Sequence, residues 1–514
     1  MSRYPRVMLI TTPIRPAPTT HPPVACLSIV TALRKRGVEE VEFYDIDGHR
    51  PTYNDVLEHI RTCKPDILGI SAIVSTAYGF CKRLSLDIKA TLPKTMIVLG
   101  GGLVAAADVV LRKTGVDVCC TGEGEKTMFD LVAQYAEFGI NKDHFAHIPG
   151  LAWLDEGTIK MTRLADQLSD HEIFDIDWSI LDETNTRDVR FRSDAEALSS
   201  FAHDPRFYEP ERRGKFHGKF FSSKGCVARC TFCHRFGKGI RYIPMDLLKS
   251  RLTHFIQRYN IGFLSWNDEN FGVHDRWLEP FCAMMKEFNV LWNVGGIRVG
   301  QVTPKKLAMM HDAGCVRVSY GMETGSERML KVMEKKVELE DNYNAARWTT
   351  EAGIAHGIQL VIGMPGETAT TVRETIKFAQ QSLAIDPWLS PFDLGINHAQ
   401  ALPGTPLYEF ARNHSLIGSS TDAEEQYLLD VSDKNARDSK TTLNFTGCPR
   451  IVMESWLLQI YIEVRYYYVK QFGIDHHICP VDFIAKSFGY RWGHLESAIR
   501  HRKPAYPVGF FQTY

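Results

Sequence analysis

The chain has 514 residues, which is too long for one ordinary hydrophobic core, so two or three domains are expected. Apolar residues make up 44% of the chain and charged residues 24%, and the formal net charge is −1. This composition is typical of a soluble globular protein, and the lack of excess positive charge argues against an extended nucleic-acid-binding surface. A small-molecule substrate fits best, and a peptide substrate stays open.

The sequence predicts a cytoplasmic protein without a membrane partner. Its first residues lead into a short apolar strand rather than the core of a signal peptide. No stretch reaches the roughly 20 apolar residues that a membrane helix needs, and the most apolar late segment, 456–469, contains Glu463 and Arg465. The 12 cysteines are scattered and do not form a secreted disulfide framework.

Residues 1–145 alternate strands and helices in a doubly wound, Rossmann-like α/β pattern. The predicted strands are 6–11, 41–45, 66–71, 95–101 and 116–121, and the predicted helices are 24–35, 53–62, 77–91 and 126–136. Their strand ends carry small or hydroxyl residues, namely Thr11, Thr12, Ser71, Ala72, Gly100, Gly101, Gly102, Gly122, Glu123 and Gly124. A ligand crevice is expected at these ends, but without a G-x-G-x-x-G turn nicotinamide binding is disfavoured.

Residues 146–214 are expected to form a hairpin and a linker. A β-hairpin is predicted over 150–162, because Asp155-Glu156-Gly157 separates two alternating runs; we assign it to the connector. The rest of the segment is charged and aromatic without clean periodicity, consistent with a linker that wraps both domains.

Residues 215–412 repeat a strand–helix unit six times, which predicts a partial (β/α)6 barrel. The strands are expected at 218–222, 262–266, 291–297, 316–320, 358–362 and 394–398, and the helices at 245–258, 276–288, 303–313, 326–333, 341–352 and 370–382. In such folds the chemistry gathers at the carboxyl ends of the strands. The residues that follow each strand are therefore the candidates for function.

Three cysteines, Cys226, Cys230 and Cys233, follow the first barrel strand with C-x3-C-x2-C spacing. Three thiolates in one short loop suit an iron–sulfur cluster. A [4Fe–4S] cluster normally has four cysteine ligands, so three leave one iron open to a small molecule. A structural zinc site with His234 as fourth ligand is the alternative, but zinc ligands usually come from two separated pairs.

The later barrel strands also end in unusual turns. Asn267-Asp268-Glu269-Asn270 follows the second strand, where a simple turn would more often use Gly or Pro and where a helix cap is the alternative. Arg298 follows the third strand and would meet a carboxylate or cap a helix. The fourth strand leads into Tyr320-Gly321-Met322-Glu323-Thr324-Gly325, the fifth into Gly363-Met364-Pro365-Gly366-Glu367-Thr368, and the sixth into Leu402-Pro403-Gly404-Thr405-Pro406.

The cysteine spacing and the ordered turns resemble the radical S-adenosylmethionine (SAM) superfamily. The resemblance implies that the open iron binds the amino and carboxylate groups of SAM and delivers an electron to its sulfonium, which yields a 5′-deoxyadenosyl radical. Glu323 resembles the ribose-binding acid of that family, and the G-x-P-G-E-T turn resembles its adenine-binding strand edge. The full expected SAM set is Phe232, Asp268, Glu269, Asn270, Arg298, Gly321, Glu323, Gly363, Pro365, Gly366 and Glu367.

The glycine turns of the first domain resemble the cobalamin-binding domain that precedes many radical SAM enzymes. Its G-I-S-A, L-G-G-G and G-E-G-E turns occur in the same order, so the resemblance implies cobalamin at the strand-end residues named above. The D-x-H-x-x-G motif of other corrinoid proteins is absent, as it usually is in this branch, since Asp45-Ile46-Asp47-Gly48-His49 lacks its spacing. A degenerate α/β domain kept for packing or partner binding is the alternative.

Residues 413–514 are expected to be mainly helical, and the resemblance implies that they cap the barrel mouth. Their clustered aromatics, Trp456, Tyr461, Tyr466, Tyr467 and Tyr468, are candidates for substrate contact, with core packing as the alternative. His476 and His477 suggest a metal site or a proton donor, or simply a solvated turn.

The resemblance implies a cobalamin-dependent radical SAM enzyme, a probable class B methyltransferase acting on an unactivated carbon of a small biosynthetic intermediate. The radical would take a hydrogen atom, methylcobalamin would give its methyl group, a second SAM would restore it, and an external donor such as flavodoxin or ferredoxin would supply electrons.

Three alternatives stay open. A radical cyclase or oxidase would use both cofactors without methyl transfer. A cobalamin-free radical SAM enzyme, such as a methylthio-transferring one, is disfavoured because the first domain has no extra cysteine triad. A non-catalytic iron–sulfur or corrinoid carrier would bind its cofactor but form no 5′-deoxyadenosine.

Overall fold

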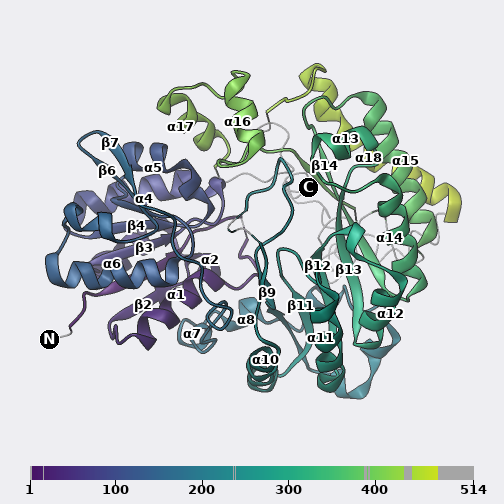
Figure 1. Ribbon diagram of the computed structural model, residues 1–514, viewed down its shortest axis with the longest axis horizontal. Helices are drawn as coiled ribbons and strands as arrows, with labels where there is room; N and C mark the ends of the chain where they lie inside the picture. Colours follow the sequence, from purple (N-terminus) through teal and green to yellow (C-terminus); the bar gives the residue numbers. More distant parts are fainter. Residues whose placement is uncertain are drawn as a thin grey trace, which may run out of the picture.

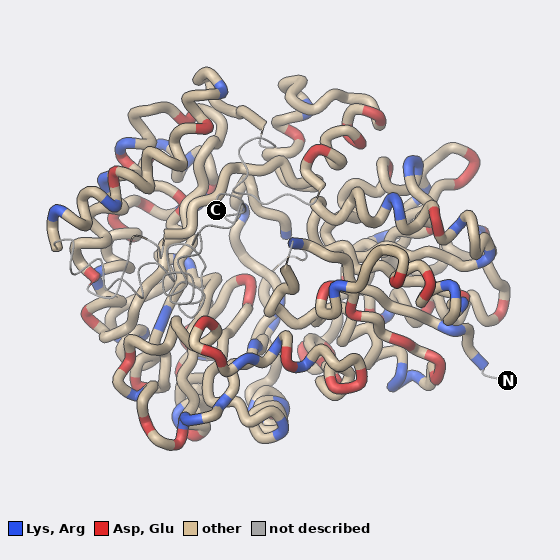
Figure 2. Tube along the Cα trace, turned by 180° about the vertical axis from the view of Figure 1, so that it is seen from behind, with Lys and Arg blue, Asp and Glu red and all other residues tan. Residues whose placement is uncertain are grey.

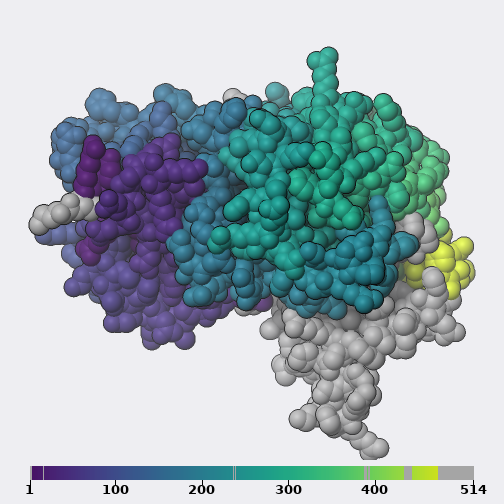
Figure 3. Space-filling view, turned by 90° about the horizontal axis from the view of Figure 1, so that it is seen from below, coloured from purple at the N-terminus to yellow at the C-terminus, as the bar shows by residue number. Residues whose placement is uncertain are grey.

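The computed structural model describes residues 3–472 except 16, 236, 238, 387–390, 392–393 and 433–442. An N-terminal α/β domain and a larger barrel lie side by side, and helices α16 and α17 lie above the junction between them (Figure 1). Figure 3 shows the two parts as one elongated body seen from below. The expected histidine pair, His476 and His477, lies outside the described residues.

The N-terminal sheet has seven strands in the order β2-β1-β3-β4-β5-β6-β7. They are β1 (Val7–Thr11), β2 (Val41–Tyr44), β3 (Ile67–Ser71), β4 (Met96–Gly100), β5 (Val118–Cys120), β6 (Leu151–Asp155) and β7 (Thr158–Met161). The first five strands pair in parallel, and every residue of β1 is buried because helices cover both faces.

Two helical layers enclose this sheet. The elements are α1 (Val24–Lys35), α2 (Ile46–His49), α3 (Tyr53–Cys63), η1 (Ser75–Ala77), α4 (Tyr78–Thr91), η2 (Gly102–Ala106), α5 (Ala107–Lys113), α6 (Gly124–Phe138) and η3 (Lys142–His147). Leu9 of β1 shares one apolar cluster with Leu27 of α1 and Leu131 of α6, whereas Ile10 shares another with Ile60 of α3 and Leu84 of α4. This alternation is what a doubly wound sheet requires.

We expected the hairpin β6–β7 to belong to the connector, and this was wrong. The hairpin extends the N-terminal sheet. Leu151 pairs with Cys120 of β5 in antiparallel register. Because β5 has only three residues and would otherwise be an exposed edge, the hairpin covers it. Ala152 and Trp153 are buried there.

The segment after the hairpin touches both domains. It contains the short elements α7 (Ile180–Glu183), α8 (Arg187–Arg190), α9 (Ala195–Leu198), η4 (Pro205–Tyr208) and η5 (Pro210–Arg212). Arg190 reaches two acids of the N-terminal domain. Phe201 packs with Phe263 and Val316, near the amino ends of two barrel strands, so this stretch covers that end of the barrel.

The barrel sheet is open and entirely parallel, in the order β15-β14-β13-β12-β11-β8. Its strands are β8 (Phe216–Phe220), β11 (Ile261–Trp266), β12 (Leu291–Ile297), β13 (Cys315–Glu323), β14 (Ala355–Ile362) and β15 (Leu394–His398). The helices between them are α10 (Met245–Tyr259), α11 (Asp275–Phe288), η6 (Val299–Gln301), α12 (Pro304–Asp312), α13 (Glu327–Val332), α14 (Leu339–Glu351) and α15 (Ala369–Ile385). This arrangement confirms the predicted partial barrel.

Some barrel strands differ from their predicted bounds: β8 lies two residues earlier, β11 begins one residue earlier and β14 begins three residues earlier, and β13 is longer at both ends. We expected β13 to end at Tyr320, but it continues through Glu323, with an irregular register against β14 between Gly321 and Glu323. A small ladder, β9 (Ser223–Lys224) with β10 (Arg241–Tyr242), closes the base of the cysteine loop.

The last described helices have separate packing partners. They are α16 (Pro406–Asn413), α17 (Thr421–Asp430) and α18 (Arg450–Phe472). Helix α17 packs on α4 and α5 of the N-terminal domain, and α18 packs along α15 of the barrel. Trp456 and Tyr468 are buried in that contact, which supports packing for these two aromatics, whereas Tyr466 is exposed. Among the described helices, α18 included, we find none with the length and apolar character needed to cross a bilayer.

Candidate active site

The cysteine loop is anchored to the barrel on both sides. The backbone N–H of Thr231 donates to the Met333 carbonyl at the end of α13, and the N–H of Leu407 in α16 donates to the Thr231 carbonyl, at 3.1 and 3.0 Å. Gly225 opens the loop with φ +97°, and a Cβ there would lie 2.4 Å from the Gly239 carbonyl oxygen. The loop is therefore held by its backbone, which leaves its thiols available as ligands.

The three predicted cysteines lie together in this loop. Cys230 is buried, Cys226 is half-buried and Cys233 is exposed as a residue. Neighbouring atoms nevertheless remove water from the Cys233 sulfur, and this desolvation, together with the Cys230 and Cys226 thiols, raises the pKa of Cys233 to about 11. Mutual repulsion of this kind is relieved when a metal cluster takes the thiolates.

Asp268, just after the carboxyl end of β11, forms hydrogen bonds with the residues that follow the neighbouring strand β8. Its Oδ1 accepts the backbone N–H and hydroxyl of both Ser222 and Ser223, just before the cysteine loop. Burial raises the pKa of Asp268 to about 6, and the serine donors oppose that rise. Asp268 Oδ2 is buried without a hydrogen-bond partner.

The next two residues differ from each other. Glu269 accepts the N–H of Gly225, and burial raises its pKa. Asn270 is fully buried, and neither its Oδ1 nor its Nδ2 has a partner. Since buried polar groups are normally hydrogen-bonded, Asp268 and Asn270 present unused hydrogen-bonding atoms at this strand end.

Glu323 and Arg298 converge on one lysine that the motifs do not include. Lys335 Nζ lies 2.7 Å from Glu323 Oε1, and Arg298 donates to the Lys335 carbonyl. Glu323 has φ +64°, and its carboxylate folds over Gly321, where a Cβ would lie 2.4 Å from Oε1. The charges of Glu323 and Lys335 both act on the Cys233 thiol, so this group lies beside the cysteine loop.

Glu367 closes the turn after β14. Its Oε2 accepts the N–H groups of Gly363 and Met364, and its Oε1 is buried without a partner. Burial raises the pKa of Glu367 to about 7. Gly366, with φ +76°, presents its carbonyl to Arg328 of α13 at 2.7 Å. The carboxyl group therefore shapes the turn and keeps one free oxygen.

The predicted crevice of the N-terminal domain is built mainly from backbone. Ala72 N–H donates to the Gly100 carbonyl across the ends of β3 and β4. Gly101 has φ +93°, and a Cβ there would lie 2.5 Å from the Ala72 carbonyl oxygen. Only glycine permits this approach.

Some predicted crevice side chains already have partners within the protein. Thr11 Oγ1 donates to Asp45 at 2.9 Å, and Thr12 Oγ1 donates to the Ser71 carbonyl at 3.1 Å. The Glu123 carboxylate bonds Arg241 and also lies 3.2 Å from Lys224 Nζ, so it joins the N-terminal domain to the base of the cysteine loop. Although burial opposes it, the net effect of these cations lowers the pKa of Glu123.

Two further cations at the domain junction were not predicted from the sequence. Arg190 is fully buried and bonds Asp45 at 2.6 Å and Asp47 at 3.2 Å. Lys219, inside β8, donates to Thr20 of the N-terminal domain at 2.6 Å, and burial followed by the nearby charge of Arg190 lowers its pKa to about 8. Lys219 could have been noticed in the sequence, because it is a charged residue within an otherwise apolar predicted strand.

The two domains meet at the cysteine loop. A Cβ placed on Gly404, in the turn after β15, would lie 3.0 Å from Ala105 of η2 and 3.6 Å from His234 Nε2. Phe232 packs into an apolar cluster that also holds Leu103 of η2. Figure 2 shows acidic and basic residues interspersed along both domains.

The residues present fit the groups that the resemblance implies. Three thiols in one loop suit a [4Fe–4S] cluster with an open iron. The unpaired buried atoms of Asp268, Asn270 and Glu367 suit the polar groups of a nucleoside-bearing ligand. A Cβ on Gly100 would meet nothing within 4 Å, so the end of β4 leaves open space for a large planar cofactor.

Comparisons with known proteins agree with these two regions. The family model of the B12 binding domain matches residues 10–132, and that of the Radical SAM superfamily matches residues 221–379. The first is the domain for cobalamin, and the second is the domain for a [4Fe–4S] cluster and SAM.

Individual relatives are distant. The anaerobic magnesium-protoporphyrin IX monomethyl ester cyclase of Rubrivivax gelatinosus is 25% identical over 70% of this chain, which spans 62% of the length of that relative. An uncharacterized methyltransferase of Pyrococcus horikoshii is 24% identical, and the match covers 78% of this chain and 80% of the length of that relative. The structure of the radical SAM methyltransferase TsrM from Kitasatospora setae, with tryptophan and a SAM analogue bound, has a TM-score of 0.65 at 17% identity, over 97% and 99% of the two chains.

These findings confirm the predicted pairing of a cobalamin domain with a radical SAM barrel, and the structural likeness shows a shared fold. The chain is a member of the radical SAM superfamily that carries a B12-binding domain ahead of its radical SAM domain.

Proposed function

We propose that this protein is a cobalamin-dependent radical SAM methyltransferase that acts on an unactivated carbon of a small molecule. The observation that carries the proposal is the junction at Gly404, where the cysteine loop and the crevice helix η2 approach the same turn. A substrate held between the two regions would face both cofactors. That is the placement which methyl transfer to a carbon radical requires.

When bound, the cluster with SAM supplies a carbon-centred radical, and cobalamin supplies a transferable methyl group. The protein supplies the scaffold. Cys226, Cys230 and Cys233 would hold the cluster, and Asp268 fixes the strand end from which their loop starts. Glu323 would position SAM beside the loop.

The names of the relatives support methyl transfer, and one of them also supports a second candidate reaction. The Pyrococcus horikoshii relative and the TsrM structure both carry the name methyltransferase. The Rubrivivax gelatinosus relative is a cyclase, so a radical cyclisation or oxidation without methyl transfer is the second candidate. Because the chain spans only part of the cyclase, the match leaves that reaction as a proposal too.

The experiment requires no knowledge of the substrate. The protein is reconstituted anaerobically with iron, sulfide and hydroxocobalamin, separated from free corrin, and given reductant and SAM with a deuterated methyl group. Mass spectrometry then measures 5′-deoxyadenosine, S-adenosylhomocysteine and the label in the corrin fraction. The Cys230→Ala variant provides the matched control for cluster chemistry.

A methyltransferase should transfer the labelled methyl group to retained corrin and form S-adenosylhomocysteine. Formation of 5′-deoxyadenosine with retained but unlabelled corrin would contradict methyl transfer and favour the cyclase-type candidate. Corrin binding without any SAM cleavage would contradict both and indicate a carrier.

A further inference from the structure

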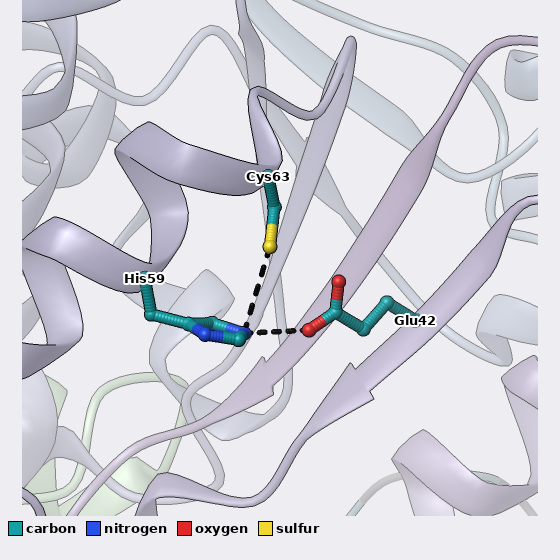
Figure 4. A group of neighbouring side chains, drawn as sticks. All are labelled: Glu42, His59 and Cys63. Carbon is teal, nitrogen blue, oxygen red and sulfur yellow. Dashed lines mark hydrogen bonds and ion pairs between the residues drawn. The ribbon is translucent and has the colours of Figure 1, made fainter.

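A cluster of three metal-binding side chains lies outside the proposed active site. Glu42, His59 and Cys63 point toward one another on the N-terminal domain (Figure 4). Their ligand atoms, one carboxylate oxygen, one imidazole nitrogen and one sulfur, all lie within 4.8 Å of one another. His59 Nε2 is 2.5 Å from Glu42 Oε1 and 3.7 Å from Cys63 Sγ.

Rigid elements hold this cluster. His59 and Cys63 are four residues apart on α3, so they share one helix face. Thr52 caps that helix through a capping box with Asp55. Glu42 lies on β2, the edge strand of the sheet, and the Tyr44 ring packs 4.3 Å from the imidazole of His59.

The ligand set suits a borderline-soft divalent ion. Zinc takes cysteine sulfur, histidine nitrogen and carboxylate oxygen, and three protein ligands leave one position open. Without metal, burial and then Glu42 raise the pKa of the Cys63 thiol to about 11. Metal binding would release that thiol proton to solvent and replace the short contact between His59 and Glu42.

A cavity lies beside the cluster. It has a volume of about 600 Å³, and its lining includes all three ligands together with Tyr44 and His49. A fourth ligand, water or a small anion, would therefore have room. His49 lines the cavity but is not part of the ligand set.

The cluster is remote from the cobalamin crevice. The cavity is also lined by Arg6, Val7 and Pro65, at the amino ends of β1 and β3. Glu42 pairs with Met8 of β1, three residues before the crevice residue Thr11, which is about 10 Å along the strand at roughly 3.3 Å per residue. A metal here would not be part of the radical chemistry.

We propose that Glu42, His59 and Cys63 bind one zinc-type divalent ion, with a fourth coordination position open to the adjacent cavity. The ion would link the edge strand β2 to α3 through its ligands and would stabilise the N-terminal domain.

The test uses the full chain loaded with its iron–sulfur cluster and corrin. The protein is incubated with zinc, freed of unbound metal by gel filtration, and analysed for zinc and iron by mass spectrometry. Wild type and the control His49→Ala should each retain about one zinc per chain, whereas Cys63→Ser and His59→Ala should lose it. Iron content and 5′-deoxyadenosine formation should be the same in all four proteins.

X-ray absorption at the zinc edge identifies the ligands directly. The proposal predicts one sulfur at about 2.3 Å and nitrogen or oxygen ligands at about 2.0–2.2 Å. Zinc retained by Cys63→Ser, or bound mainly by sulfur, would place the ion elsewhere and overturn the proposal. Failure of the wild type to retain zinc would overturn it as well, whatever the fate of the radical chemistry.

Discussion

The strand ends of the barrel and those of the N-terminal domain are built by different means. In the barrel, buried carboxyl groups shape the loops: Asp268 accepts from two serines, and Glu367 accepts from its own turn. In the N-terminal domain, the ends of β3 and β4 interlock through backbone atoms at Ala72 and Gly101.

The difference follows from the ligands that the two regions are proposed to hold. A small polar ligand and a metal cluster need directed donors and acceptors, so side chains at the barrel carry the specificity. A large planar cofactor needs open space beside the backbone, and the end of β4 leaves it at Gly100, where a Cβ would meet nothing within 4 Å. The two regions should consequently respond to different kinds of substitution.

The largest effect is expected at the cysteine loop. Cys230→Ala removes one of the three proposed thiolate ligands and should abolish 5′-deoxyadenosine formation, with loss of the cluster absorbance after anaerobic reconstitution. Cys448→Ser, at a half-buried thiol far along the chain, should keep both signals. A Cys230→Ala protein that still cleaves SAM would break the assignment of the barrel region.

A second effect tests the buried carboxyl of the barrel turn. The pKa of Glu367 is raised from 4.5 to about 7, so the folded protein binds more protons than the unfolded chain between these values, and stability falls as pH rises through them. Glu367→Gln removes this loss, which amounts to about 3 kcal/mol. Thermal unfolding at pH 5 and pH 8 should show the variant gaining relative to wild type at the higher pH; equal shifts at both would contradict the burial argument.

A smaller effect is expected where the two regions join. Glu123→Gln leaves Arg241 and Lys224 without their carboxylate, and denaturant unfolding should show a loss of about 2 kcal/mol, because these side chains keep 15% and 21% exposure. Corrin retention should fall as well. Asp166→Asn, in an exposed ion pair with Arg163, is the control and should leave both unchanged. A Glu123→Gln protein as stable as wild type would show that these ion pairs do not help to hold the two domains together.

The smallest effect distinguishes two adjacent glycines. Gly101→Ala forces a Cβ against the Ala72 carbonyl at positive φ and should cost about 1–3 kcal/mol together with corrin affinity. A Cβ on Gly100 meets no protein atom within 4 Å, so Gly100→Ala should leave stability unchanged, while its methyl group enters the open crevice and weakens corrin binding. Equal denaturant unfolding of the two variants would show that the close backbone contact at Gly101 is not needed.

Sequence patterns predicted the regular elements of both sheets well. Strands β12 and β15 have the predicted bounds, because apolar runs between turn residues mark buried parallel strands clearly. The predicted place of the β6–β7 hairpin was wrong, because its sequence pattern does not reveal that it covers the edge strand β5. The bonds of Glu123 to Arg241 and of Arg190 to Asp45 join residues more than a hundred positions apart, which spacing rules cannot pair.

Pulsed electron paramagnetic resonance can measure whether the cluster and the corrin lie close together at the junction of the two domains. The loaded protein is reduced so that cobalt(II) in the corrin and the reduced cluster are both paramagnetic. If the two cofactors meet there, each signal should be broadened or split by the other, and the effect should disappear in Cys230→Ala. A spectrum equal to the sum of two independent signals would contradict it.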